Sequence, residues 1–233
     1  MLGPGDIALV SAISSRVVAT DPRVQRTRSA VFAAATLLFL RDGYTATMEA
    51  IAARAGVARR SVYNNFRDKD ALFTEIVREA IGYAEDFARS LREELGASTT
   101  AAAVRRVLND LGRRLALTIL RQEVIALRRL LVSEALTFPG LAKEYFHRAP
   151  GQVMRTLAEA FAQLARRGLL RVRDPGRAAE QFAYLVAGAL LDRAILVGRV
   201  PPRKEIVGCA AEGVRTFLAR YGSSEPTRAG LAQ

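Results

Sequence analysis

The chain has 233 residues, half of them hydrophobic, so a substantial core can form and disorder throughout is not expected. The formal charge of +12 at pH 7 favours an anionic partner. Ala, Leu and Arg dominate the composition, only eight prolines occur, and no alternating run of β-branched residues recurs. We therefore expect an all-α fold.

The N-terminal segment and the cysteine content bear on location. Residues 7–19 are mildly apolar, but they are too short and too polar to span a bilayer, and no positive charge precedes them. We expect residues 1–21 to be a disordered leader; a short amphipathic arm and a wrongly assigned start codon are the alternatives. Cys209 is the single cysteine, so no intrachain disulfide can form. No membrane association and a cytoplasmic location are expected.

Three helices are expected after the leader, and the last two are short and joined by a tight turn. The first covers residues 22–42. Thr47 is placed to cap the second helix, and Gly56 can end it with a left-handed backbone. In the third helix Val62 and Phe66 are four residues apart and turn toward the core. This pattern predicts a helix-turn-helix.

The other face of the third helix is cationic and polar. It carries Arg59, Arg60, Ser61, Tyr63, Asn64 and Asn65. Such a face suits the major groove of DNA. Residues 22–69 hold nine Lys and Arg against three Asp and Glu, which supports a domain that faces phosphates. An arginine-rich genome, which would bias every surface position, is the alternative source of this excess.

Start and stop signals predict seven further helices. Their expected ranges are 68–96, Ser98 or Thr99 to about 121, onward to about 136, 139–147, 150–168, 174–198, and a last helix after Pro202 to about Tyr221. Residues 176–198 are mostly small and apolar, so this helix must be covered on more than one face. A second subunit could provide that cover.

The sequence resembles the TetR family in the order and spacing of several residues. These are Gly43, Tyr44, Thr47, Ile51, Ala52, Ala55, Gly56, Val57, Tyr63, Phe66, Lys69 and Leu72. Residues 131–146 and 174–188 resemble the AefR-like type of C-terminal domain. The resemblance implies a homodimeric transcriptional regulator, usually a repressor, whose variable helical domain binds a small molecule that lowers its affinity for a double-stranded DNA operator.

Carried over by position, the resemblance also implies a set of DNA contacts. Thr47, Tyr63, Asn65 and Lys69 would touch phosphates, and Arg59, Arg60, Ser61, Tyr63 and Asn64 would face base edges. The chain departs from the family pattern at Ala58, where a small polar cap is common, and at Arg60, where glycine is common. The missing cap should cost the recognition helix about 1 kcal/mol. Arg60 adds a donor that could bind guanine.

The expected domains are a helix-turn-helix domain over residues 22–67, a helical ligand-binding and dimerisation domain over 68–221, and a flexible tail over 222–233. By resemblance, residues 150–167 and 176–198 form an intersubunit four-helix bundle. The candidate ligand-binding residues are Leu111, Leu115, Leu131, Glu134, Phe138, Tyr145, Phe161 and Phe182. Aromatic residues at helical spacing are more often plain core, and Glu134 could instead pair with a neighbouring arginine.

No catalytic constellation is found. The chain has one histidine, His147, one cysteine and no glycine-rich phosphate loop, so we expect neither an enzyme nor a metal site nor a bound cofactor. The alternative to an operator-binding regulator is a helical module that keeps the fold and binds a protein partner.

Overall fold

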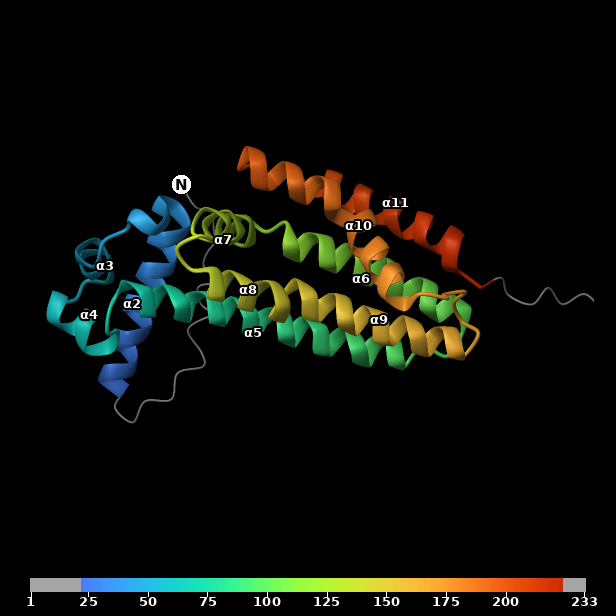
Figure 1. Cartoon of the computed structure of the whole chain (residues 1–233), viewed down its shortest axis with the longest axis horizontal. Coiled ribbons are helices and arrows are strands. Elements are labelled where there is room, and N and C mark those ends of the chain that lie inside the picture. The colour runs from blue at the N-terminus through green and yellow to red at the C-terminus, as the bar shows by residue number, and fades with distance from the viewer. Residues whose placement is uncertain (1–21, 224–233) are drawn as a thin grey trace, which may run out of the picture. The chain divides into compact units, whose positions relative to one another are not determined.

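The computed structural model describes residues 22–223, so the predicted leader and most of the predicted tail lie outside the described residues. Within this range the chain forms helices and no strand, which confirms the all-α prediction (Figure 1). The helices are α2 (Pro22–Asp42), η1 (Gly43–Thr45), α3 (Met48–Ala55), α4 (Arg59–Asn65), α5 (Lys69–Gly96), α6 (Ala101–Ile119), α7 (Gln122–Ser133), α8 (Pro139–Arg148), α9 (Pro150–Arg166), α10 (Pro175–Val197) and α11 (Arg203–Tyr221).

The chain divides into two compact units. The first contains residues up to Tyr83 together with 126–149, and the second contains 84–125 and the residues from Pro150 onward. Helix α5 therefore begins in the first unit and ends in the second. The boundary expected at residue 67 falls inside the first unit, which also holds α8 and most of α7.

In the first unit, α3 and α4 pack against α2. Val31, Phe39, Ile51 and Val62 are buried at their contacts. Helix α3 begins where the sequence predicts, because the Thr47 hydroxyl oxygen accepts a hydrogen bond from the backbone N–H of Ala50 (3.1 Å). It ends at Gly56, whose φ of 67° lies in the left-handed region.

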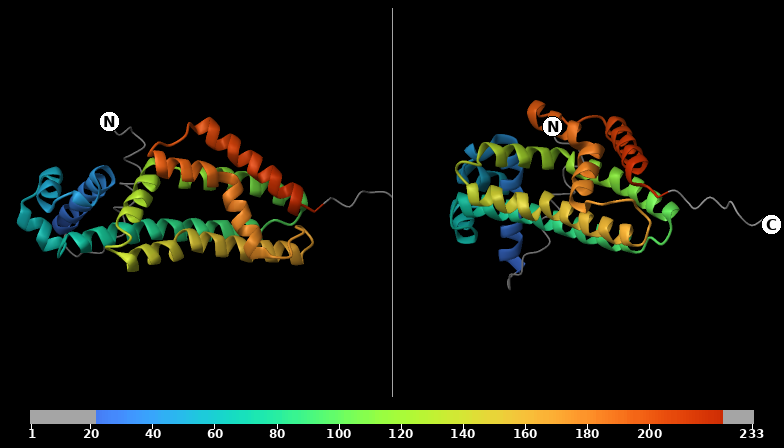
Figure 2. Two further views of the ribbon diagram at one scale, coloured as in Figure 1. Left: turned by 45° about the horizontal axis from the view of Figure 1, so that its top comes forward. Right: turned by 45° about the vertical axis from the view of Figure 1, so that its right-hand side comes forward.

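The second unit is a helical bundle in which α10 contacts α6, α9 and α11 (Figure 2). Its centre is an aromatic cluster of Phe161, Phe182 and Phe217, all fully buried. Their ring centroids are 5.1–5.8 Å apart, which is the spacing of favourable aromatic pairs. Tyr221 extends the cluster and donates its hydroxyl hydrogen bond to Gln181 (2.6 Å).

The start of α6 and the end of α7 differ from the predicted ones. Helix α6 is capped by Thr100, whose hydroxyl oxygen accepts from the N–H of Ala103 (3.1 Å), and not by Ser98 or Thr99. Ser98 is buried and donates to the carbonyl of Glu94 instead (3.4 Å). Helix α7 stops at Ser133, short of residue 136, because the Glu134 carbonyl accepts from two N–H groups in a turn that leads to α8.

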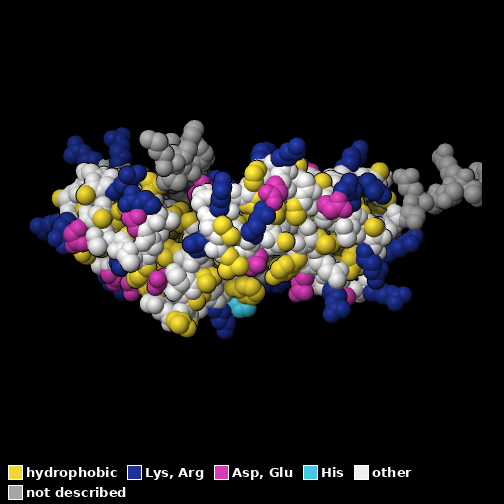
Figure 3. Space-filling view, turned by 90° about the horizontal axis from the view of Figure 1, so that it is seen from above, with side chains coloured by type: hydrophobic (Ala, Val, Ile, Leu, Met, Phe, Trp, Pro, Cys, Tyr) yellow, Lys and Arg dark blue, Asp and Glu magenta, His cyan; other side chains and the backbone are white. Residues whose placement is uncertain are grey.

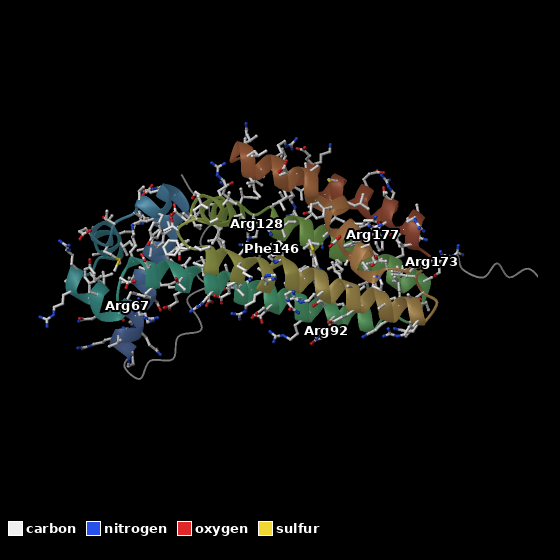
Figure 4. The ribbon with its side chains drawn as sticks, in the orientation of Figure 1. Arg67, Arg92, Arg128, Phe146, Arg173 and Arg177 are labelled. Atoms are coloured by element: carbon white, nitrogen blue, oxygen red, sulfur yellow. The ribbon has the colours of Figure 1, made fainter. Side chains whose placement is uncertain are left out.

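The outer faces of α9 and α10 differ in polarity. The exposed positions of α9 include Arg155, Glu159 and Gln163, and Glu159 pairs with Arg92, the α5 residue labelled in Figure 4. Helix α10 instead exposes large apolar side chains: Tyr184, Leu185, Leu196 and Val197. Exposed apolar side chains of this size on a surface helix are candidates for packing against a partner.

Neither a metal site nor a membrane-spanning helix is found in the described residues. No group of three His, Cys, Asp or Glu side chains in residues 22–223 could hold a metal ion. Nor does any described helix combine the length and the apolar character needed to cross a bilayer.

Cys209 is half-buried on α11, and burial raises the pKa of its thiol. It is therefore held as a neutral thiol of small volume.

The close approach of α10 and α11 makes a test of the fold. A Cβ at Gly213 would lie 2.8 Å from the Val186 nitrogen and still closer to the Leu185 carbonyl group, so only backbone movement could admit it. We expect Gly213→Ala to lower the free energy of unfolding by about 1–3 kcal/mol. Gly208→Ala on the same helix meets nothing within 4 Å and should raise it by up to about 1 kcal/mol. Chemical denaturation at one fixed protein concentration measures both, and equal effects would contradict this packing.

Candidate nucleic-acid interface

Helix α4 is seven residues long and depends on its surroundings for its position. Its N-cap residue, Ala58, offers no side-chain hydrogen bond, as the sequence predicts. The N–H of Ser61 instead bonds to the Ala58 carbonyl (2.9 Å). Val62 and Phe66 are buried and fix one face of the helix against the core. The opposite face is thereby left to solvent.

The exposed face carries most of the residues predicted to read DNA. Arg59, Arg60, Tyr63 and Asn64 are exposed, whereas Ser61 is half-buried. Figure 3 shows Lys and Arg side chains projecting from the surface of the part of the chain that holds these helices, with Asp and Glu side chains among them. Arg67, labelled in Figure 4, follows α4 and adds a further exposed guanidinium group, which pairs with Asp68 (2.7 Å). The structure therefore brings the predicted base-reading residues together on one cationic surface.

The two neighbouring arginines at the start of α4 differ in their partners. The Arg59 guanidinium donates to the carboxylate of Glu49 on α3. Arg60 makes no ion pair with any residue in the described part of the chain. Arg59 is therefore paired within the helix-turn-helix, whereas Arg60 is available to an acceptor on another molecule.

The predicted phosphate contacts are less open than the base-reading face. Thr47 is exposed, and only its acceptor oxygen is used in capping α3. Asn65 is half-buried and donates its side-chain amide to the Ser61 carbonyl (2.8 Å). The Lys69 ammonium donates to the carbonyl of Tyr44 (2.8 Å) and lies 4.1 Å from the centroid of its ring. An ammonium group has three donors, so Lys69 could contact a phosphate while it keeps this bond.

Tyr44 is the centre of a second aromatic cluster, within the first unit. Its ring packs on Phe39, Phe73 and Phe138, with centroids 5.1–5.9 Å away. Burial raises the pKa of the Tyr44 phenol, and a hydrogen bond to the Asp70 carboxylate raises it further. Tyr44 therefore stays a neutral donor and ties η1 to the first turn of α5.

Arg28 of α2 makes a clamp on the end of the recognition helix. Its guanidinium donates to the carbonyl of Asn65 (2.6 Å) and to both oxygens of the Glu75 carboxylate on α5 (2.5 and 2.6 Å). It also lies 4.3 Å from the centroid of the Phe66 ring. These bonds are charge-assisted and partly buried, so they are among the stronger polar contacts of the unit. One side chain thus joins α2, α4 and α5.

Asp68 sets the start of α5, as predicted. Its carboxylate accepts from the N–H of Ala71 (2.7 Å). This bond, followed by the one from Arg67, lowers the pKa of Asp68. The carboxylate is therefore ionised at neutral pH, and its negative charge interacts favourably with the positive end of the helix dipole. The beginning of α5 is fixed directly after the recognition helix.

The predicted ligand-binding residues are divided between the two units. Leu111, Leu115, Phe161 and Phe182 belong to the buried core of the second unit. Leu131, Glu134, Phe138 and Tyr145 belong to the first unit, where Phe138 packs in the Tyr44 cluster. A groove of about 350 Å³ in the second unit is lined by other residues, Asn109, Asp110, Arg113, Val207 and Ala211. Phe161 and Phe182 are fully buried in the core of the second unit, whereas Phe138 and Tyr145 are half-buried in the first.

The sequence prediction missed Arg28, Glu75 and Glu49. One signal was available for Arg28, which lies three residues before the buried Val31 and so falls on the apolar face of its helix. A charge at such a position needs a partner. Nothing in the sequence identifies that partner as Glu75 or as a carbonyl on α4, because both contacts join distant parts of the chain.

The Arg28 clamp predicts a large effect of one substitution. Arg28→Met keeps the aliphatic stem but removes every bond to Asn65 and Glu75, so the free energy of unfolding should fall by about 2 kcal/mol. Arg26→Met on the exposed side of the same helix is the control and should change it by less than about 0.5 kcal/mol. Denaturant titration of both variants measures the difference. Similar values would show that the clamp contributes little.

Family models match most of the chain. The model of bacterial regulatory proteins of the tetR family matches residues 31–76, which include the helix-turn-helix. The model of the C-terminal domain of AefR-like transcriptional repressors matches residues 106–223, about half of the chain. No curated protein sequence matches the chain.

Solved structures agree with this result. A TetR-family transcriptional regulator from Mesorhizobium loti is 28% identical, with a TM-score of 0.76 over 87% of this chain and 100% of its own. The flavonoid-responsive regulator FrrA is 29% identical, with a TM-score of 0.60 over 88% and 99%. SmeT, the repressor of a Stenotrophomonas maltophilia multidrug efflux pump, is 24% identical, with a TM-score of 0.56 over 84% and 91%, and shares the fold. With its cationic helix-turn-helix and its matched C-terminal domain, the chain belongs to the TetR family of transcriptional regulators, with an AefR-like C-terminal domain.

Proposed function

We propose that the protein binds a palindromic DNA operator as a homodimer and represses transcription until a small apolar or amphipathic ligand releases it. The single observation that carries this proposal is the exposed cationic face of α4, with Arg60, Tyr63 and Asn64 directed away from the core. A dimer presents two such helices, and dimeric helix-turn-helix proteins read half-sites about 34–36 Å apart. The operator should therefore have two related half-sites. Such a regulator would act where the DNA is, in the cytoplasm.

The contact residues in this proposal keep the predicted roles. Arg59, Arg60, Ser61, Tyr63 and Asn64 read base edges, while Thr47, Tyr63, Asn65 and Lys69 approach phosphates. Arg60 has no ion-pair partner in the described chain, which leaves its two parallel donors available to guanine O6 and N7. We therefore propose a guanine in each half-site opposite Arg60.

For the dimer we propose the α10 face as the main contact. Tyr184 is 67% exposed, and Leu185, Leu196 and Val197 lie exposed on the same helix. A second copy would remove these side chains from water. The outer face of α9 is charged and lends no similar support to the predicted contact through residues 150–167. We therefore propose that α9 contributes less of the dimer interface than α10.

For the effector we propose that binding acts through α5. This helix starts beside the recognition helix with Asp68 and Lys69, and its Glu75 holds Arg28, which holds α4. A displacement of α5 would therefore move α4 in each subunit and disturb simultaneous docking on two half-sites. Similarity to a regulator described as flavonoid-responsive supports a small-molecule effector in general. The ligand must favour the released state by a few kcal/mol.

Titration with DNA tests the operator proposal. Binding to the protein's own upstream region should be sequence-specific, and log affinity should fall steeply and linearly with log salt concentration, because phosphate contacts release counterions. Operators selected by the wild type should contain guanine at a position that Arg60→Ala no longer selects, a loss of about 1–3 kcal/mol of discrimination. Unchanged preferences in the variant would reject that role for Arg60.

A substitution on α10 tests the dimer. Tyr184→Arg places a charge in the proposed interface, so sedimentation should show dissociation to monomers at micromolar concentration, and operator affinity should fall by more than tenfold. The control is Leu136→Arg, at an apolar side chain that is 98% exposed in the first unit. The control should stay dimeric. A dimeric Tyr184→Arg protein would move the interface elsewhere.

The alternative is a helical interaction module that keeps the fold without binding an operator. The DNA titration separates the two proposals. Binding that lacks sequence preference, or that does not depend on salt, would favour the interaction module, because neither base reading nor phosphate contacts would then be present.

A further inference from the structure

The segment that joins α9 to α10 carries a strong excess of positive charge. Residues 166–177 include five arginines and one acid, Asp174, so a third of the formal excess of the chain lies in this short segment. The five residues of this arginine cluster are all exposed: Arg166, Arg167, Arg171, Arg173 and Arg177. The cluster belongs to the second unit, so it is separate from the exposed face of α4 in the first.

Contacts within the second unit fix this segment on its surface. The Arg167 guanidinium donates to the carbonyl of Ser98, just after α5 (2.5 Å). The backbone N–H of Arg171 donates to the carbonyl of Tyr221 at the end of α11 (2.7 Å). Arg220 precedes Tyr221 and is exposed, so α11 adds a sixth cation beside the cluster.

Three members of the cluster have no acidic partner. Arg166, Arg173 and Arg177 form no ion pair with any residue between 22 and 223; the last two are labelled in Figure 4. Asp174 caps α10 by accepting from the backbone N–H of Arg177 (3.0 Å). Arg177 lies in the first turn of α10, where a cation is unfavourable to the helix dipole. Ion pairing within the described chain therefore does not account for the cluster, whereas an anionic partner would.

The surroundings of the cluster favour one kind of anion. The large apolar side chains that the described part of the second unit exposes all lie on α10, between Tyr184 and Val197. Protein partners and membrane surfaces are bound through apolar or aromatic side chains together with charge. The DNA backbone is bound chiefly through charge, and one guanidinium group can donate two parallel hydrogen bonds to a phosphate. The cluster therefore fits the phosphates of a nucleic acid.

We propose that the arginine cluster of the second unit is a second DNA-binding surface, which contacts phosphates and reads no sequence. When α4 is docked on an operator, the cluster can hold another duplex. The inference goes beyond the proposed function, because contact with phosphates does not require a specific site.

The test uses the full-length protein with Arg166→Gln, Arg173→Gln and Arg177→Gln combined. The protein is saturated with an immobilised operator, and retention of a labelled duplex of scrambled sequence is measured between about 50 and 200 mM salt. The wild type should retain this second duplex. The variant should retain it at least about tenfold more weakly at the low salt concentration, and the slope of log affinity against log salt should be smaller by about 2–3, because each phosphate contact contributes about 0.9.

The matched control combines Arg89→Gln, Arg92→Gln and Arg215→Gln. These arginines are exposed in the same unit and carry the same charge, but each is paired with an acid. The control should retain the second duplex as the wild type does. No retention by the wild type, or an equal loss in both variants, would overturn the inference, as would binding of the cluster to phosphatidylglycerol vesicles and not to DNA. If no operator can be selected, the proposed function alone fails, and direct titration of the scrambled duplex still separates the cluster variant from its control.

Discussion

The reading surface depends on how a seven-residue helix is held in place. An isolated helix of this length is not stable in water, and α4 also lacks a side-chain cap at Ala58. Its orientation must therefore come from tertiary contacts. The buried Val62 and Phe66 fix its inner face, and the Arg28 guanidinium fixes its end through the Asn65 carbonyl. These three contacts leave Arg60, Tyr63 and Asn64 exposed on the outer face.

The same contacts join the recognition helix to α5. Arg28 bonds to Glu75 through both carboxylate oxygens, while Lys69 and Asp70 at the start of α5 bond to Tyr44. Two separate connections thus lead from α5 to the helix-turn-helix. Both connections consist of charge-assisted hydrogen bonds, and they join the first two turns of α5 to the residues around the helix-turn-helix.

Local signals allowed much of the fold to be predicted. Thr47 and Gly56 bound α3 because capping depends on neighbouring residues alone. The start of α6 could not be predicted in the same way, since Ser98 and Thr100 are both capping residues and burial decided between them. The ligand-binding residues could not be singled out from the sequence for a related reason. Phe161 has the same helical spacing whether it lines a cavity or fills a core, and that choice is made by helices far away in the sequence.

The arginines of the reading surface differ in their ion pairing, which composition does not reveal. Arg59 and Arg60 are adjacent and equally basic, so a count of charges treats them alike. Their surroundings separate them, because Glu49 reaches Arg59 across the turn and no described residue pairs with Arg60. A wholly unpaired cationic face would bind any DNA strongly. Holding one arginine with an internal carboxylate lowers the affinity of this face for DNA, because the pair must be exchanged before that guanidinium can contact a phosphate or a base.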